Sequence, residues 1–118
     1  MDKRYIAIRG KEYRVEINWN TVEDFARMKG LHISDALALS LQDGDTMKVM
    51  MTAALREGER LDGRTFDLTP VQVGEMISLA NVNEFVQIYR QQYLGEDEGK
   101  PSSAKDDGKK KGRIRTAN

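Results

Sequence analysis

The sequence predicts an α+β fold that is mostly α-helical, with an N-terminal β-hairpin packed on a bundle of about four to five short helices and a disordered C-terminal tail. Three observations predict it. Apolar and polar residues alternate over 5–17, apolar residues recur at helical spacing over 19–94, and they become scarce over 95–118. We therefore expect one helical domain with an N-terminal hairpin over 1–94, and a disordered charged tail over 95–118 that is basic at its end.

The predicted hairpin turns at Gly10-Lys11, a two-residue loop of the kind that joins antiparallel strands. Counting outward from this turn pairs Ile8 with Tyr13, and the other pairs follow. Because side chains alternate along a strand, this register gathers the apolar side chains on one face, which is expected to cover a helical layer. That face consists of Ile6, Ile8, Tyr13, Val15 and Ile17.

Two helices are expected after the hairpin. The first begins at Asn20 or Thr21, either of which can accept hydrogen bonds as an N-terminal cap, and it ends at Gly30. A weaker, shorter helix covers 34–41, where Asp35 lies in the first turn, as the helix dipole favours.

The strongest helical pattern covers 46–61, which we expect to form the central helix of the core with Asp45 as its cap. Glu57 and Glu59 are expected on its polar side, and Asp62-Gly63 ends it. Its apolar residues trace one stripe, formed by Met47, Met50, Met51, Ala54, Leu55 and Leu61.

The rest of the domain is predicted as a connection and two further helices. Residues 64–68 look extended, and one more short strand there stays open. Thr69 then caps a helix that has Pro70 in its first position, and Asn81 with Glu84 forms a capping box for the last helix. The apolar residues of that last helix are Phe85, Val86, Ile88, Tyr89, Tyr93 and Leu94.

Few residues offer catalytic or metal-binding chemistry. The chain has no cysteine, so it lacks disulfides, a thiolate nucleophile and cysteine zinc ligands. Its single histidine, His32, is expected in a loop between helices, without a second histidine to share a metal. Asp43-Gly44-Asp45 is better explained as a turn and helix cap than as a calcium loop. We therefore expect no enzyme activity, no metal site and no cofactor.

Hydropathy and charge limit which cellular compartment and which kinds of binding partner are expected. No apolar run approaches the roughly 18 residues that a membrane helix needs, and no signal peptide is visible, which predicts a cytoplasmic protein without a membrane partner. The whole chain has a formal net charge of zero, but 95–118 contains five acids and seven bases, which leaves 1–94 slightly acidic. The domain itself therefore lacks the basic character of a nucleic-acid module.

The order of these elements resembles the small tail assembly chaperones of long-tailed bacteriophages and prophages, which are encoded near the tape measure protein. The resemblance covers 1–94 and is carried by the hairpin, by 19–25, by 54–58 and by 68–76 leading into Phe85. It implies a non-enzymatic protein in the bacterial host cytoplasm. Such a protein binds the tape measure protein, keeps it soluble and helps to recruit tail tube subunits.

A helical domain can shield an apolar helix of a partner by offering it a groove. The residues expected to contact the partner are Met50 and Met51 on the central helix and Tyr89 and Tyr93 on the last helix. Methionine adapts to varied apolar surfaces and tyrosine suits a half-wet interface. Methionines on an amphipathic stripe are more often core filler, so a docking role requires that one edge of the stripe be exposed.

The tail is the second candidate for an interaction, through Lys109, Lys110, Lys111, Arg113 and Arg115. Such a density of charge can hold nucleic-acid phosphates weakly and without sequence specificity, although a solvating tail is the simpler interpretation. Two alternative functions stay open: a nucleic-acid-associated accessory protein tethered through this tail, and a small structural subunit of a phage particle. A homo-oligomer also stays open, because the stripe over 46–61 can pack within one chain or between two.

Overall fold

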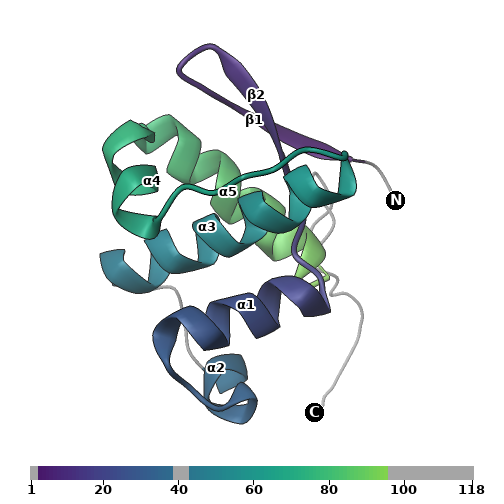
Figure 1. Ribbon diagram of the computed structural model, residues 1–118, viewed down its shortest axis with the longest axis vertical. Coiled ribbons are helices and arrows are strands. Elements are labelled where there is room, and N and C mark those ends of the chain that lie inside the picture. The colour runs from purple at the N-terminus through teal and green to yellow at the C-terminus, as the bar shows by residue number, and fades with distance from the viewer. Residues whose placement is uncertain (1–2, 39–42, 96–118) are drawn as a thin grey trace, which may run out of the picture.

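The computed structural model describes residues 3–38 and 43–95, and it confirms the predicted mostly helical fold with an N-terminal hairpin. In chain order the elements are β1 (Arg4–Ile8), β2 (Lys11–Val15), α1 (Trp19–Lys29), α2 (Ile33–Ala38), α3 (Gly44–Leu61), α4 (Pro70–Met76) and α5 (Leu79–Gln92). Helix α3 crosses the middle of the domain, with α1 and α2 on one side and the hairpin and α4 on the other (Figure 1). Helix α5 passes behind α3 in this view.

The hairpin forms with a register two residues away from the predicted one. Its turn residues are Arg9 and Gly10, so that Ile8 pairs with Lys11 and not with Tyr13. Both turn residues have positive φ, 52° and 81°, as a two-residue type I′ turn requires. A shift of two residues leaves every side chain on its predicted face. The buried members of the apolar face are Ile6, Ile8, Val15 and Ile17.

Helices α1 and α5 begin earlier than predicted. Thr21 and Asn81, predicted as caps, are instead the third residues of their helices. Their backbone N–H groups donate to the side chains of Asn18 and Ser78, the actual caps, and their own side chains accept from the backbone N–H groups of those caps. The prediction missed these boxes because the usual third residue is Glu or Gln.

Helix α3 also begins earlier than predicted. Its cap is Asp43 and not Asp45, because the carboxylate of Asp43 accepts a hydrogen bond from the backbone N–H of Thr46 at 2.8 Å. The predicted end is confirmed, since Asp62 is the C-terminal cap and Gly63 follows with a φ of 79°.

The shorter elements agree in part with the prediction. Thr69 caps α4 and Pro70 is its first residue, as expected. The described part of the short helix ends at Ala38, and the predicted continuation over 39–41 lies outside the described residues. Residues 64–68 form an irregular connection and not a strand.

Helix α3 is the predicted central helix, and it is buried along most of its length because α1, β2 and α4 all pack against it. Its ends differ from its middle, since Met47 is half-buried and Leu61 is 42% exposed. The buried apolar side chains of this helix are Val49, Met50, Met51, Ala53, Ala54 and Leu55.

Strand β2 lies directly on the backbone of α3. A Cβ atom at Gly58 would lie 2.1 Å from the carbonyl oxygen of Arg14, so only glycine permits this approach. The backbone N–H of Glu16 donates to the carbonyl oxygen of Ala54 at 3.1 Å. The backbone N–H of Arg14 donates to the carboxylate of Glu59 at 2.9 Å. Helix α3 therefore satisfies donors that β2 does not share with β1.

Candidate docking groove

The C-terminal half of α3 contains two buried carboxylates, which corrects the expectation that Glu57 and Glu59 lie on a polar, solvated side. They are 5% and 2% exposed because the hairpin and α1 cover this part of the helix. Arg60 donates two hydrogen bonds of 2.8 Å to Glu57, and Arg64 donates two of 2.8 and 2.9 Å to Glu59. All four carboxylate oxygens are therefore occupied within the fold.

These contacts set the charge state of both groups. Hydrogen bonds from Arg60, followed by those from Asn18 and Asn20, lower the pKa of Glu57 to about 2. Hydrogen bonds from the Arg64 side chain, followed by that from the Arg14 backbone, lower the pKa of Glu59. Both acids are therefore ionised at neutral pH and hold the hairpin, α1 and α3 together.

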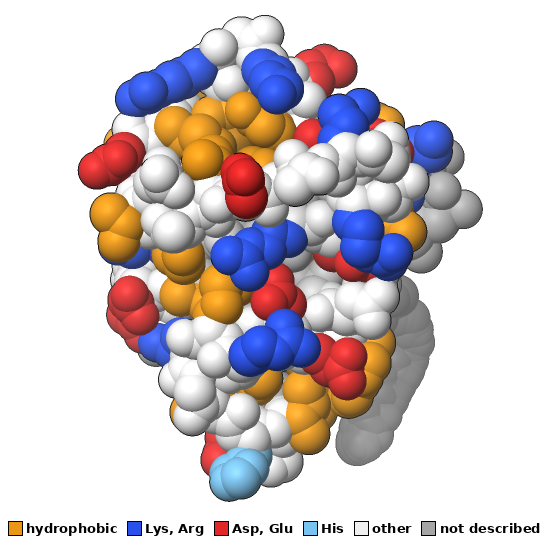
Figure 2. All heavy atoms as spheres, in the orientation of Figure 1, with side chains coloured by type: hydrophobic (Ala, Val, Ile, Leu, Met, Phe, Trp, Pro, Cys, Tyr) orange, Lys and Arg blue, Asp and Glu red, His pale blue; other side chains and the backbone are white. Residues whose placement is uncertain are grey.

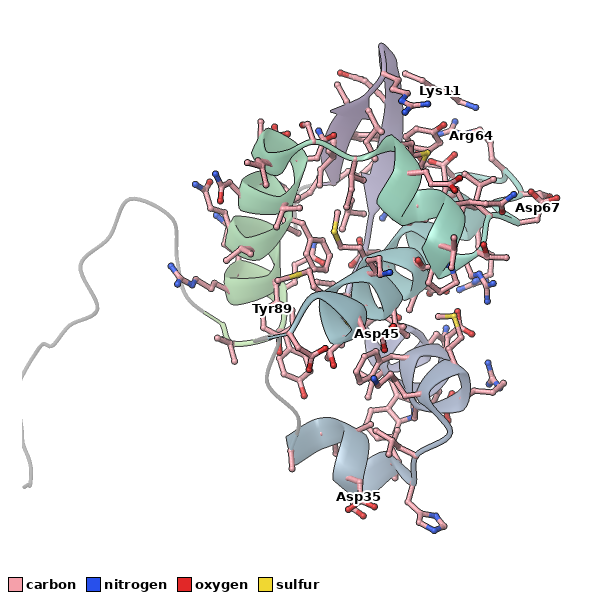
Figure 3. All side chains as sticks on the ribbon, turned by 90° about the vertical axis from the view of Figure 1, so that its left-hand side faces the viewer. Lys11, Asp35, Asp45, Arg64, Asp67 and Tyr89 are labelled. Carbon is pink, nitrogen blue, oxygen red and sulfur yellow. The ribbon has the colours of Figure 1, made fainter. Side chains whose placement is uncertain are left out.

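An apolar groove opens at the opposite end of α3, where it meets α4 and α5. Its volume is about 480 Å³, and its apolar lining comes from Met47, Ile77 and Val82. Gly74 on α4 contributes no side chain to the groove, and a Cβ atom there would lie 2.7 Å from the Cδ atom of Lys48. Figure 3 looks toward this end of the domain and labels Asp45 at the start of α3.

Helix α5 extends this apolar surface along its own length. Five apolar side chains on α5, which we call the α5 stripe, are separated alternately by three and four residues. This is the spacing of a coiled-coil seam. Leu79 is 85% exposed and the other four are half-buried, whereas Phe85 and Ile88 on the adjacent face are fully buried. The α5 stripe therefore borders the core and is partly exposed. It consists of Leu79, Val82, Val86, Tyr89 and Tyr93.

Charged side chains at the start of α3 form the rim of the groove. Asp43 and Asp45 line it together with Lys48. Hydrogen bonds from the backbone and side chain of Thr46 lower the pKa of Asp43, so this carboxylate is ionised at neutral pH. Asp45 accepts from the ammonium of Lys29 at 2.9 Å, and its side chain is still 69% exposed. The apolar part of the groove thus lies beside two carboxylates and the ammonium of Lys48, with the ammonium of Lys29 paired to Asp45.

The four residues predicted to contact a partner divide into two pairs. Met50 and Met51 are 3% and 1% exposed, which contradicts the expectation of an exposed edge at these two positions and confirms their alternative role as core filler. Elements on several sides of α3 cover them. Tyr89 and Tyr93 do lie together on the α5 stripe, with ring centroids 4.9 Å apart and planes 20° apart. Burial raises the pKa of Tyr89.

The most exposed apolar residue of this surface, Leu79, was not among the predicted partner contacts. Leu79 was excluded because the helix was expected to begin after it, at Asn81. Once α5 begins at Leu79, the alternating spacing from there to Tyr93 is visible in the sequence. Met47 is the half-buried methionine of the stripe and lines the groove, although the sequence assigned it no separate role.

A second opening, lined by both apolar and charged side chains, lies between α1 and α2. Trp19 is 56% exposed at its edge, and the opening has a volume of about 410 Å³. His32 is exposed there in the connection between the two helices, as predicted. On the face shown in Figure 2, apolar patches are separated by mixed basic and acidic side chains.

Other sequence predictions concern metals, membranes and the tail. Within residues 3–38 and 43–95, no group of three or more histidine or acidic side chains is placed to hold a metal ion. No helix in that part of the chain is both long and apolar enough to cross a membrane. The tail cations lie outside the described residues; they are Lys109, Lys110, Lys111, Arg113 and Arg115.

Comparison with known proteins finds no matching family model, no matching curated protein and no matching solved structure. The function of this protein is therefore inferred from its own sequence pattern and surface.

Proposed function

We propose that this protein is a non-enzymatic tail assembly chaperone of a long-tailed phage or prophage. It binds the tape measure protein in the bacterial cytoplasm, keeps it soluble and helps to recruit tail tube subunits. The observation that carries the proposal is the α5 stripe beside the groove, a seam of apolar side chains at coiled-coil spacing on the surface of the domain. The resemblance in the order of the hairpin and helices supports the same function.

The physical reason is the cost of leaving apolar surface in water. Each Å² of apolar surface that a partner covers contributes roughly 25 cal/mol, so an apolar helix gains by lying against Leu79, Val82 and Met47. A contiguous apolar surface on a small domain is typical of an interaction site. The shallow groove offers few anchors, which favours weak and reversible binding, as suits a chaperone that leaves the finished particle.

Co-expression with the tape measure protein of the same genome tests this proposal. We expect most of the tape measure protein to stay in the supernatant after ultracentrifugation when the full chain is present, and to sediment when it is absent. Tube subunits added to the soluble complex should co-elute with it in size-exclusion chromatography. An unchanged soluble fraction would overturn the proposal.

Two further outcomes would favour one of the alternative functions over the chaperone. Presence of the chain in purified particles would favour a structural subunit. Retention of nucleic acid by the full chain, lost on nuclease treatment and reduced steeply by salt, would favour the accessory protein tethered through its tail.

A further inference from the structure

We infer that the groove and the α5 stripe accept an amphipathic helix whose apolar seam is flanked by basic residues, so that the site selects its partner by charge as well as by hydrophobicity. The inference rests on the proposed function and specifies the chemistry of the segment that is bound.

The shape of the site indicates a helix as the occupant. Helix α5 has 14 residues, which corresponds to a length of about 21 Å and about two heptads of contact. Its stripe presents side chains at the spacing that the seam of a second helix matches. The groove adds Met47 and Ile77 from two other elements, so the bound helix lies over a junction of α3, α4 and α5.

The charges at the rim indicate basic flanks. Asp43 and Asp45 occupy the start of α3, at one wall of the groove. The ammonium of Lys29 lies on the α1 side of Asp45, and the stem of Lys48 lies against Gly74. A lysine or arginine on the bound helix would gain a charge-assisted contact with these carboxylates, whereas a glutamate there would be repelled.

Two synthetic helices test the chemistry directly. Both have three heptads with leucine at the a and d positions, and they carry either lysine or glutamate at the e and g positions. Fluorescence anisotropy with the full chain at low salt should show that the lysine helix binds about fivefold more tightly, with the difference shrinking as salt screens the contacts. Equal affinities would overturn the selection by charge, and absence of binding by both would overturn the docking site.

Matched variants locate the site. Leu79→Asp should weaken binding of the lysine helix at least about tenfold, since an anchor is replaced by a charge, whereas Leu37→Asp on α2 should leave it unchanged. Leu79→Gln should weaken binding as well, since it removes the anchor without adding a carboxylate that could itself attract the lysine helix, and circular dichroism checks that both variants are folded. Equal loss in the Leu37 variant would overturn the assignment to this groove.

The charge contact has its own pair of variants. Asp45→Asn should reduce the preference for the lysine helix to near unity, and Asp35→Asn should preserve it. Both acids lie in the first turn of a helix, but Asp35 lies on α2, well away from the groove (Figure 3). An undiminished preference in the Asp45 variant would overturn the role of this rim.

The variants also separate this inference from the proposed function. If Leu79→Asp solubilises the tape measure protein as well as the unmodified chain does, the function stands and the docking site is wrong. If the lysine helix binds as expected but the tape measure protein does not, the docking site stands and the function is wrong. If the full chain is a dimer that Leu79→Asp dissociates, the occupant is a second copy and the inference is overturned.

Discussion

The two ends of α3 show how one helix can serve stability and recognition separately. At its C-terminal end the polar groups are buried and paired, and Gly58 lets the backbone of β2 touch the helix. At its N-terminal end the apolar side chain of Met47 is half-buried beside the groove, and charges form a rim. The difference teaches that residue polarity alone does not reveal which end of the helix is covered by other elements. Here the acids at the C-terminal end are buried, whereas part of the apolar surface at the N-terminal end is exposed to solvent.

The two glycines that face neighbouring elements provide the sharpest test of this comparison. We expect Gly58→Ala to lower the free energy of unfolding by about 3 kcal/mol, because the new methyl group overlaps the backbone of β2. Urea unfolding followed by circular dichroism measures this change.

Gly74→Ala is the matched control at the open end of the helix. Its methyl group meets only the stem of Lys48, which can move aside, so the better helix propensity of alanine should leave stability unchanged or raise it by up to about 1 kcal/mol. Equal destabilisation by both substitutions would show that the two ends are packed alike.

The second largest loss of stability is expected when the buried carboxylate of Glu59 is removed. Glu59→Met keeps a similar volume but leaves the backbone N–H of Arg14 without its acceptor, which should cost about 2 kcal/mol. Urea unfolding measures the loss, and faster hydrogen exchange at the Arg14 amide would locate it. Asp67→Asn, at an exposed acid of the connection after α3, serves as a control with little expected effect.

Acidic pH should lower the stability of the protein, because Glu57 at the C-terminal end of α3 becomes protonated. Its pKa is about 2 in the folded protein against an ordinary value of 4.5, so its stabilising contribution is present above pH 4.5 and is lost as the pH falls toward 2. Glu57→Gln should therefore be less stable than the unmodified chain by about 1.5 kcal/mol at pH 7, with the difference shrinking below pH 4.5. Thermal unfolding between pH 7 and pH 3 measures it, with Glu84→Gln as the exposed control. A difference that does not change with pH would contradict the assigned ion pair.

The smallest effect on stability is expected at the open end. Leu79→Asp should change the free energy of unfolding by less than about 0.5 kcal/mol, because this side chain is 85% exposed and an acid is favoured in the first turn of a helix. A loss of several kcal/mol in urea unfolding would show that Leu79 supports the core and is not free to bind a partner.

Several elements were predictable because their causes are local. The sorting of the hairpin faces, the Thr69-Pro70 start of α4 and the glycine after α1 follow from alternation, capping and backbone freedom. The errors were also local in kind. The hairpin turn lies at Arg9-Gly10 because Arg9 adopts a positive φ, which is uncommon for arginine. Helices α1 and α5 start further upstream because Thr21 and Asn81 occupy the third position of their capping boxes, where Glu or Gln is usual.

The candidate site was less predictable than the fold. Tyr89 and Tyr93, which were predicted to contact a partner, are half-buried, and their neighbours Leu79 and Val82 were not among the predicted contacts. Met50 and Met51 share an amphipathic stripe with Met47, and nothing in the spacing distinguishes the buried members from the half-buried one. That distinction depends on how far along α3 the neighbouring elements α1, β2 and α4 pack.

By itself the sequence determined which segments become strands and helices, which face of each is apolar, and that 46–61 forms the centre of the core. These follow from periodicity and local hydrogen bonding, which need only neighbouring residues. Only the tertiary structure decided that Glu57 and Glu59 are buried and that the α5 stripe is left partly open. Burial is settled by contacts between distant segments, such as Gly58 with Arg14, and no local pattern encodes them.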